Sequence, residues 1–294
     1  MSDHGEKTID TLVEDIYSVI SGKGGWDNAV NEYFLGNLGE TMMSRLGEPK
    51  EERPKGLLRM SSIGQPCSRK LWYSTNSSEE GEDFEPSTLL KFIYGDLLED
   101  FILALAVAAG HKVEGRQDEL TIEGIKGHRD AVIDGVTIDV KTASTYSFKK
   151  FEKHNLEKED PFGYLTQLGS YVLAGKDDPL VKDKKGGAFL AMDKQHGHLC
   201  LDYYDFEESG MLRGLPVLYQ KRKDLVVKAE PPYRTFSDIP EGSSGNKKLD
   251  INCSYCNFKG LCWPGLRTFL YKQKDGFRPV YLTNVTKTPR VMEV

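Results

Sequence analysis

Two aspartates lie in apolar segments where strand alternation calls for hydrophobic side chains. The stretch GHRDAVIDGVTIDVKTAS, residues 127–144, has an Asp-Gly dipeptide between two alternating runs. This pattern predicts a β-hairpin with a two-residue turn, in which Ile133 pairs with Val136. Counting back along both strands sets Asp130 opposite Asp139, so the two carboxylates share one face of the hairpin.

A divalent cation between these carboxylates would make the hairpin a site for phosphate chemistry. Cβ atoms of directly opposed residues are about 5 Å apart, so the two charges repel unless a cation lies between them. Mg²⁺ and Mn²⁺ take oxygen ligands and leave coordination positions for water and a substrate phosphate. Lys141 lies beside Asp139 on the same predicted face, opposite His128, and is suited to orient an attacking water. The alternative is a solvent-facing strand pair in which Lys141 only neutralises Asp139.

A third carboxylate lies within the apolar helix predicted over residues 89–110. Burying Glu99 there would cost several kcal/mol unless the side chain is paired or binds a metal. Gly95, one helical turn earlier, leaves room for another backbone or a ligand to approach. Exposure of Glu99 on the solvent side of the helix is the alternative.

Two polar side chains, Gln167 and Tyr171, are spaced to share one face of a later helix. Asp160-Pro161 predicts the start of this helix, with the aspartate as capping residue, and Gly175 predicts its end. Residues four apart in a helix are neighbours, so the amide and the phenol should point the same way. They are suited to contact phosphates or a metal-bound water. The alternative is an amphipathic helix with a tyrosine at the edge of the core.

Three of the five cysteines occur within ten positions, in INCSYCNFKGLCWP. Cys253, Cys256 and Cys262 have the spacing C-x2-C-x5-C, and clustered cysteines in a cytoplasmic protein are more often metal thiolates than disulfides. A four-coordinate site needs a fourth ligand, for which Cys67 is the best candidate. Cys200 lies in an apolar strand and is expected to pack as a small hydrophobe. Zinc and a four-iron, four-sulfur cluster both accept four thiolates, so the spacing does not choose between them.

The composition is that of a globular protein, with 294 residues of which 38% are hydrophobic and 29% charged. No apolar run approaches the roughly 20 residues of a membrane span and no signal-peptide pattern opens the sequence, so a cytoplasmic location is expected. The net charge of −6 argues against indiscriminate coating of nucleic acid but permits a basic groove. Helices are predicted over 8–46 and 212–229, and a second hairpin over 186–194 and 198–206.

The order of these residues resembles that of RecB-type members of the PD-(D/E)XK nuclease superfamily. Gly95 to Glu99 resembles motif I of this family, and GHRD with Asp130 resembles motif II. Asp139-Val140-Lys141 resembles motif III, and Gln167 to Tyr171 resembles the Q-x-x-x-Y motif. The cysteine before motif I and the three after the core resemble the iron–sulfur clasp of CRISPR-adaptation, AddB-type and phage-exonuclease members. The motifs together span residues 67–262. Many iron–sulfur members have a histidine where this chain has Glu99, and a carboxylate there is similar to phage recombination exonucleases.

The resemblance implies a metal-dependent deoxyribonuclease, a single-strand-preferring exonuclease of phage-type DNA recombination, replication or degradation. It implies one or two Mg²⁺ or Mn²⁺ ions held by Glu99, Asp130, Asp139 and the carbonyl of Val140. By the same resemblance, Lys141 would activate the attacking water, and Gln167 and Tyr171 would contact the DNA. His128 would assist or only pack. The same resemblance makes Cys67, Cys253, Cys256 and Cys262 the ligands of a structural 4Fe-4S cluster, with Zn²⁺ as the alternative. The implied partners are single-stranded or end-containing DNA and proteins of a recombination or replication system, with no membrane.

The implied fold is α/β (α+β), a restriction-endonuclease-like mixed central sheet flanked by helices, with terminal segments clasped by the four cysteines. The corresponding division is a helical extension over 1–60, a nuclease core over 61–240, and a cysteine-cluster segment over 241–294 joined to Cys67. Two other functions stay open: a non-catalytic DNA-binding or scaffold protein with a structural zinc clasp, and a CRISPR-adaptation nuclease. A nuclease acting on RNA is a weaker reading, because no sequence feature recognises a 2′-hydroxyl.

Overall fold

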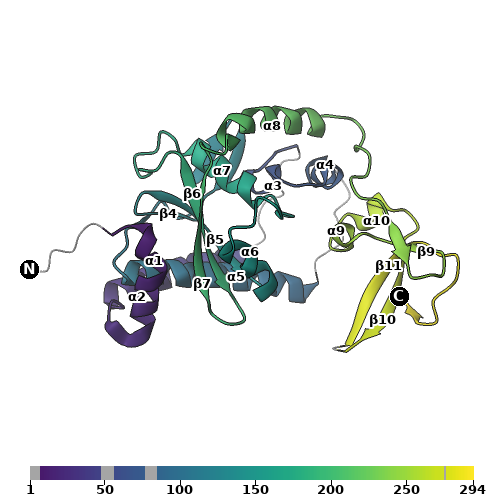
Figure 1. The fold of residues 1–294 in the computed structure, drawn as a ribbon, viewed down its shortest axis with the longest axis horizontal. Coiled ribbons are helices and arrows are strands. Elements are labelled where there is room, and N and C mark those ends of the chain that lie inside the picture. Colours follow the sequence, from purple (N-terminus) through teal and green to yellow (C-terminus); the bar gives the residue numbers. More distant parts are fainter. Residues whose placement is uncertain (1–6, 48–55, 77–84, 275) are drawn as a thin grey trace, which may run out of the picture. The chain divides into compact units, whose positions relative to one another are not determined.

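The computed structural model describes residues 7–47, 56–76, 85–274 and 276–294. Contacts divide the chain into two compact units, each built from two separate stretches of sequence. Unit 1 comprises residues 1–64 and 86–223, and unit 2 comprises residues 65–85 and 224–294. Helices combine with mixed and antiparallel sheets, so the chain has a mixed α/β fold (Figure 1).

Unit 1 is organised around a five-stranded mixed sheet with the strand order β1-β4-β5-β6-β7. The strands are β1 (Val113–Glu114), β4 (Ala131–Ile133), β5 (Val136–Ala143), β6 (Gly186–Asp193) and β7 (Leu199–Asp205). The β5–β6 pair is parallel and the other described pairs of this sheet are antiparallel. β6 and β7 form the second predicted hairpin. A separate antiparallel pair consists of β2 (Glu119–Ile122) and β3 (Ile125–His128).

The predicted Asp-Gly turn joins β4 to β5. Ile133 pairs with Val136, so the expected register is confirmed. Both turn residues have positive φ angles, 52° for Asp134 and 86° for Gly135. A type I′ turn requires this conformation at both of its central positions, which explains why an Asp-Gly pair is found there.

Unit 1 has helices that contact its five-stranded sheet and helices that pack on those helices. They are η1 (Ile9–Thr11), α1 (Leu12–Ser18), η2 (Val19–Lys23), α2 (Asn28–Leu46), α3 (Met60–Ile63), α5 (Pro86–Ala108), α6 (Thr145–Glu152), α7 (Tyr164–Ala174) and the first part of α8 (Met211–Val226). These bounds agree with the helices expected over 8–46, 89–110 and 212–229, apart from a break between η2 and α2. The helices in contact with the sheet include α5, α6 and α7, whereas α2 packs on α5 and α3 packs on α7.

One face of the sheet forms a core with α1 and α5. Its buried members are Leu12, Ile16, Ile102, Leu103, Leu105, Ala106, Ala109, Ala131, Ile133, Ile138, Val140, Ala188 and Leu190. The apolar face predicted for the hairpin is therefore confirmed. Because side chains alternate along a strand, Asp139 and Lys141 point to the other face, where α6 and α7 contact β5 and β6.

α7 begins at Tyr164, later than the Asp160-Pro161 pair predicts. The carboxylate of Asp160 still caps it, because it accepts hydrogen bonds from the backbone N–H groups of Gly163 and Tyr164 at 2.8 and 2.9 Å. Gly163, which directly precedes the helix, has a φ angle of 78°, and a Cβ at this position would overlap the backbone of Gly64. The chain thus turns through a left-handed glycine before the helix starts.

Unit 2 contains a five-stranded antiparallel sheet that the sequence did not lead us to expect. Its strand order is β12-β10-β11-β9-β8. Its elements are α4 (Ser68–Asn76), β8 (Ile239–Glu241), β9 (Asn246–Lys248), α9 (Ile251–Ser254), α10 (Lys259–Cys262), β10 (Arg267–Gln273), β11 (Gly276–Asn284) and β12 (Met292–Glu293). The short helices α9 and α10, which carry cysteines, lie in sequence between β9 and β10.

α4 is tied to the C-terminal part of the chain. The indole N–H of Trp72 donates to the carbonyl of Lys228 at 2.9 Å. The ring of Tyr73 stacks on Phe258, with centroids 5.7 Å apart. These contacts explain why residues 65–85 belong to unit 2 although residues on both sides of them belong to unit 1. In the described ranges, none of the helices combines the length and apolar character needed to cross a bilayer.

Candidate active site

The three predicted carboxylates and the predicted lysine lie together in unit 1. Glu99 comes from α5, Asp130 directly precedes β4, and Asp139 and Lys141 come from β5. The charges of Asp139 and Lys141 act on the pKa of both Glu99 and Asp130, so the four groups are within electrostatic range of one another. The structure therefore brings together residues that are separated by up to 42 positions in the sequence.

Asp130 and Asp139 are held in different ways. Asp130 is half-buried, and its Oδ2 accepts a hydrogen bond from the backbone N–H of Val140 at 2.7 Å. Asp139 is fully buried, and its Oδ1 accepts a hydrogen bond from the ammonium of Lys141. The other oxygen of Asp139, Oδ2, is buried without a hydrogen-bond partner in the part of the chain that the structure describes. An unpaired buried carboxylate oxygen is costly, which points to a cationic ligand.

The electrostatics of the site favour protonated carboxyl groups in the absence of a cation. Burial raises the pKa of Glu99 to about 7. The hydrogen bond from Gln117 and the charge of Lys141 lower this pKa, whereas the charges of Asp100 and Asp139 raise it further. Burial, and then the charges of Glu99 and Asp139, raise the pKa of Asp130 well above its ordinary value. Two or more carboxylates sharing a desolvated space are typical of catalytic and metal sites.

Lys141 is the cation among these carboxylates. Burial lowers its pKa, but the charges of Asp139 and Asp130 outweigh burial, so the pKa of Lys141 is raised above its ordinary value. Its ammonium also lies 5.1 Å from the centroid of the Tyr164 ring, a cation–π contact. Lys141 is therefore a fixed positive charge and a hydrogen-bond donor in this site.

Glu99 and Asp100 are adjacent on α5 but have different partners. Asp100 is 1% exposed and forms an ion pair with Arg116, whose Nε donates to its Oδ1 at 3.1 Å. Thr41 donates to the other oxygen of Asp100 at 2.6 Å. Glu99 has neither of these partners and lies near Asp130 and Lys141 instead. A Cβ at Gly95 would meet Thr142 Oγ1 at 3.5 Å, an ordinary contact, so the expected close approach at Gly95 is not required by the structure.

Gln167 and Tyr171 share a face of α7, as their spacing predicts. The amide of Gln167 donates to the hydroxyl of Tyr171 at 2.9 Å. Tyr171 is 2% exposed, and its pKa is raised by burial and by the nearby charge of Asp139. The phenol is therefore beside the carboxylates, and Gln167 orients it.

The predicted position of His128 is wrong. β4 begins at Ala131, and His128 belongs to β3, where it pairs with Glu119 of β2. Its imidazole Nε2 is 3.6 Å from the Glu119 carboxylate. Continuing the hairpin register beyond Asp130 would set His128 opposite Lys141. The chain instead forms the β2–β3 pair before it enters β4 at Ala131. His128 does not face Lys141.

Two residues of the site region were missed by sequence reasoning. Gln117 donates from Nε2 to Glu99 Oε1 at 2.8 Å. Arg129 is fully buried and forms ion pairs with Asp118 at 2.7 Å and Asp178 at 2.6 Å. A buried arginine needs carboxylate partners, and the Arg-Gln-Asp triplet at 116–118 contains such a carboxylate in Asp118. The arginine of GHRD is therefore the sequence signal that points to this loop.

The four predicted cluster cysteines lie in unit 2. Burial raises the pKa of the Cys253 thiol to about 12, and the charges of Cys67, Cys262 and Cys256 add to this rise. The four sulfurs are therefore within electrostatic range of one another, and none forms a disulfide. Cys200 belongs to β7 of unit 1, where it is half-buried, and burial raises its pKa to about 12. Its expected role as a small packing side chain remains a prediction.

Within the described ranges, no group of three or more His, Cys, Asp or Glu side chains is arranged so that it could hold a metal ion, and this applies to the carboxylates of unit 1 and to the cysteines of unit 2 alike. In unit 1 a physical reason is apparent: hydrogen-bond donors from Lys141 and Gln117 meet the carboxylates. The donor set itself fits a hard divalent cation, since it consists of carboxylate oxygens that include the unpartnered Oδ2 of Asp139.

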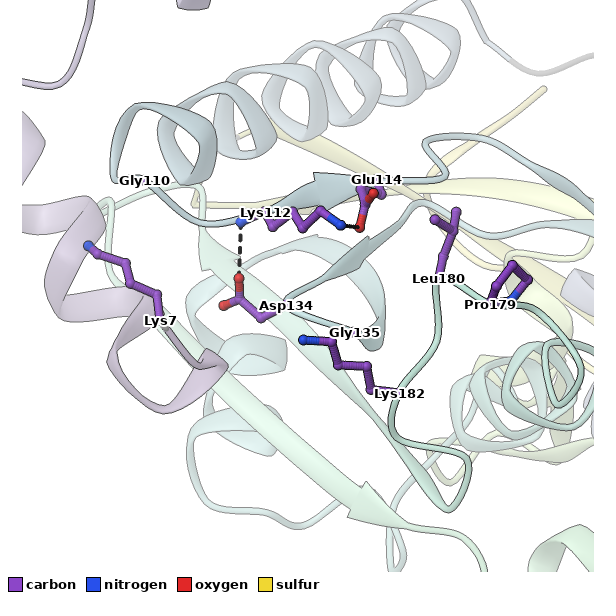
Figure 2. Close-up of a pocket in the computed structure, with 9 residues that line it drawn as sticks. All are labelled: Lys7, Gly110, Lys112, Glu114, Asp134, Gly135, Pro179, Leu180 and Lys182. Carbon is purple, nitrogen blue, oxygen red and sulfur yellow. Dashed lines mark hydrogen bonds and ion pairs between the residues drawn. The ribbon is translucent and has the colours of Figure 1, made fainter. Parts of the chain in front are cut away.

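A cavity of about 230 Å³ lies elsewhere in unit 1, at the Asp134-Gly135 turn. Figure 2 shows three lysines around it, Lys7, Lys112 and Lys182. The backbone N–H of Lys112 donates to Asp134 at 3.0 Å, and its ammonium pairs with Glu114 at 2.8 Å. None of the candidate site residues lines this cavity. It lies at the turn end of the hairpin, whereas the carboxylates lie toward the other end of its strands.

Comparisons with known proteins add little to this geometry. No protein-family model and no curated protein matches the chain. Among solved structures, one described as "Crystal structure of SSO0001" is similar with a TM-score of 0.39 and 17% sequence identity. The match covers 79% of this chain and 96% of that one.

Proposed function

We propose that this chain is a metal-dependent DNA nuclease of the PD-(D/E)XK type. The observation that carries the proposal is the convergence of Glu99, Asp130, Asp139 and Lys141 on one desolvated site. Two of these carboxyl groups have raised pKa values, and one buried oxygen of the third lacks a partner among the described residues. A structural ion pair needs one carboxylate for one lysine, so three carboxylates around one lysine exceed that need.

The order of elements in unit 1 supports a restriction-endonuclease-like core. A helix, α5, precedes the β4–β5 hairpin, two helices follow it, and β6 then adds in parallel to β5. α5 packs on the apolar face of the sheet, and its Glu99 is within electrostatic range of Asp139 and Lys141 of the hairpin. This mixed sheet flanked by helices is the architecture that the motif resemblance implies.

Glu99, Asp130 and Asp139 would hold one or two Mg²⁺ or Mn²⁺ ions, with the carbonyl of Val140 as a further ligand. When bound, such an ion lowers the pKa of a coordinated water and stabilises the charge that develops on the phosphate and the leaving oxygen. The three carboxyl groups must be ionised to do this, and the raised pKa values of Glu99 and Asp130 mean that metal binding displaces protons from them.

The side chains around the carboxylates supply the rest of the chemistry. The ammonium of Lys141 is fixed by Asp139 and Tyr164, so it can donate to the attacking water or to a phosphate oxygen without first reorganising. The phenol of Tyr171, oriented by Gln167, is a further donor next to Asp139. We assign to these two residues the contact with the DNA strand.

The four cysteines of unit 2 would bind a structural 4Fe-4S cluster or zinc. Such a site would join α4 to the segment that carries α9 and α10, and hydrolysis needs no redox chemistry from it. Free thiols at four neighbouring positions are maintained in a reducing compartment, which supports a cytoplasmic location. A single-strand-preferring exonuclease of a phage-type recombination or replication system is the specific activity that we propose.

The decisive experiment is digestion of end-labelled single-stranded, linear duplex and circular DNA in Mg²⁺ or Mn²⁺. Asp139→Ala and Lys141→Ala proteins are assayed beside the wild type, with Tyr233→Ala of unit 2 as an exposed control. We expect the wild type and the control to degrade linear DNA and to spare the circle, and both site variants to be inactive. Absence of cleavage by well-folded wild-type protein with either metal, or undiminished cleavage by Asp139→Ala, would overturn the proposal.

A further inference from the structure

Gln117 occupies the space between two carboxylates of the candidate site. Its side-chain amide donates to Glu99 Oε1 at 2.8 Å and lies 3.5 Å from Asp130 Oδ1. Its backbone N–H donates to the carbonyl of Asp130 at 3.2 Å. One residue is therefore bonded both to α5 and to the segment that leads into β4, which are the two elements that bring Glu99 and Asp130 into the site.

The residues on either side of Gln117 form ion pairs with buried partners. Arg116 pairs with Asp100, which is 1% exposed, and Asp118 pairs with the fully buried Arg129 at 2.7 Å. The backbone N–H of Arg129 also donates to the carbonyl of Asp118 at 3.3 Å. The loop between β1 and β2 is thus held at both flanks, which sets the direction of the Gln117 side chain.

The backbone of Gln117 is in an unfavourable conformation for its residue type. Its φ angle is 55°, in the left-handed region that glycine and asparagine adopt more readily. A non-glycine residue in this region costs about 1 kcal/mol or more. Local backbone preference therefore does not explain a glutamine here, whereas a side chain long enough to reach Glu99 does.

We infer that Gln117 is a positioning residue of the metal site, which fixes the separation and orientation of Glu99 and Asp130. This inference rests on the proposed function. Hydrogen-bonded partners of metal ligands hold those ligands in coordinating orientations, and their loss typically weakens metal affinity by about 10- to 100-fold. The amide also offers its oxygen, Oε1, as an acceptor for a water on the ion.

The test uses Gln117→Gly and Gln117→Asn in the full-length protein. Both residues adopt a left-handed backbone more readily than glutamine, so both variants should fold and melt at or above the wild-type temperature. Neither side chain reaches Glu99, because glycine has none and asparagine is one methylene shorter. Binding of Mn²⁺ is measured from the loss of the free-ion electron paramagnetic resonance signal, with Asp139→Asn as the control that marks binding at this site.

We expect the dissociation constant for Mn²⁺ to rise by about 10-fold or more in both variants. Wild-type affinity in a folded Gln117→Gly protein would overturn the inference, because the side chain would then be dispensable for metal binding. The proposed function fails separately: a wild type that binds Mn²⁺ through Asp139 but cleaves no DNA leaves the role of Gln117 intact and refutes the nuclease. A wild type that binds no Mn²⁺ refutes both.

A second inference comes from the charge distribution and concerns residues 251–294, the C-terminal part of unit 2. Residues 251–294 contain seven Lys or Arg and two Asp or Glu, which gives a net charge of +5. Residues 1–250 contain 32 Lys or Arg and 43 Asp or Glu, which gives a net charge of −11. Charge asymmetry of this kind between parts of a chain is typical of nucleic-acid contact by the basic part. The −6 of the whole chain conceals it.

The positive charge is concentrated at the end of the β10–β11 hairpin. Lys272, Lys274 and Arg278 are exposed there, and none of them has an ion pair with another described residue. Phe277 pairs with Lys272 across the hairpin, so both side chains lie on one face. The ring of Phe277 is 69% exposed and makes no contact with another aromatic ring in the described ranges.

We propose that this hairpin end binds single-stranded DNA, with a base stacked on Phe277 and phosphates held by Lys272 and Lys274. Arg278 pairs with Tyr271, so its side chain points to the opposite face of the hairpin. An exposed aromatic flanked by cations is the combination that single-strand-binding surfaces use, with stacking worth about 1–3 kcal/mol per base. This inference also rests on the proposed DNA substrate. It requires nothing of the carboxylate site itself.

Fluorescence anisotropy with a labelled oligothymidine, in the absence of divalent metal, tests the proposal. Phe277→Ala is compared with Tyr233→Ala, which removes a 98% exposed ring from the same unit. Lys272→Ala/Lys274→Ala is compared with Lys287→Ala/Arg290→Ala, which removes the same charge from exposed positions outside the hairpin. All four proteins should retain the wild-type melting temperature.

We expect Phe277→Ala to weaken binding by about 10-fold and Tyr233→Ala to leave it unchanged. The double hairpin variant should lower the slope of log affinity against log salt by about 0.7 per lost phosphate contact, and its control should not. Equal effects of each variant and its control would overturn the proposal. A wild type that cleaves DNA but binds normally without Phe277 would refute only this inference and not the nuclease.

Discussion

Gly127 of β3 and Tyr171 of α7 approach so closely that a Cβ at position 127 would lie 2.8 Å from Cε1 of the tyrosine. The same Cβ would be 2.7 Å from Cβ of Met60. Carbon atoms in a packed interior do not approach this closely, so an alanine would have to displace its neighbours. The glycine of GHRD therefore has a structural role: it allows the phenol of Tyr171 to lie beside Asp139.

Gly127→Ala should lower the free energy of unfolding by about 1–3 kcal/mol, the usual cost of overpacking a filled site. The added methyl also pushes on the ring of Tyr171, so DNA cleavage should fall in protein that is still folded. Chemical denaturation and a cleavage assay below the transition measure the two effects separately. A variant with unchanged stability and activity would mean that β3 moves freely away from α7.

Gly214→Ala is the matched control for this substitution. A Cβ at Gly214 of α8 meets no atom within 4 Å. Alanine is a better helix former than glycine by about 1 kcal/mol, so this variant should be as stable as the wild type or more stable. The two glycine-to-alanine changes thus have opposite expected signs, which excludes a general effect of replacing glycine.

Glu99→Gln and Asp100→Asn should separate catalysis from stability at adjacent positions. Asp100 is the buried partner of Arg116, whose second carboxylate partner, Glu40, is exposed and 3.6 Å away, so Asp100→Asn removes the stronger charge contact and should cost about 1–3 kcal/mol of stability. Glu99→Gln removes a proposed metal ligand and should lower the cleavage rate by at least about 100-fold with little loss of stability. Both are measured by urea denaturation and by single-turnover cleavage. Loss of stability without loss of activity in Glu99→Gln would contradict the assignment.

The raised pKa of Glu99 predicts a pH dependence of the metal-free protein. Between its ordinary pKa of 4.5 and its folded value of about 7, the folded state binds more protons at Glu99 than the unfolded state. Stability from this group is therefore present at low pH and is lost as pH rises through about 7. Glu99→Gln should flatten that part of the curve of unfolding free energy against pH. Metal affinity should change in the opposite direction and increase with pH through the same range, because the ion binds the deprotonated form.

The sequence was sufficient for the local elements of the site and insufficient for their surroundings. The Asp-Gly turn determines the register from Ile133–Val136 to Ala131–Ile138, because a two-residue turn and two-residue periodicity fix the pairing. Asp130 directly precedes this paired segment. Helical spacing likewise placed Gln167 next to Tyr171. These inferences depend only on contacts within one hairpin or one helix.

Contacts between distant segments could not be predicted in this way. His128 was extrapolated backwards along a strand that begins only at Ala131, and no local signal marks the point where the chain enters the sheet. Gln117 lies in a loop whose position depends on Arg116 and Arg129 finding partners on other elements. The sheet of unit 2 was missed because its strands alternate weakly and lie on both sides of the cysteine segment in sequence.

The cysteine cluster of unit 2 can be tested by colour and stability. Protein purified without oxygen should be brown with broad absorption near ~400 nm if the four thiolates bind an iron–sulfur cluster, and colourless with one equivalent of zinc if they bind that metal. Cys253→Ala should lose the metal in either case and melt at a lower temperature, because Cys253 is half-buried among Cys67, Cys256 and Cys262. Cys200→Ala removes a half-buried thiol from unit 1 and serves as the control, which should keep its full metal content. Wild-type iron or zinc content and an unchanged melting temperature in Cys253→Ala would show that the cluster of cysteines is not a metal site.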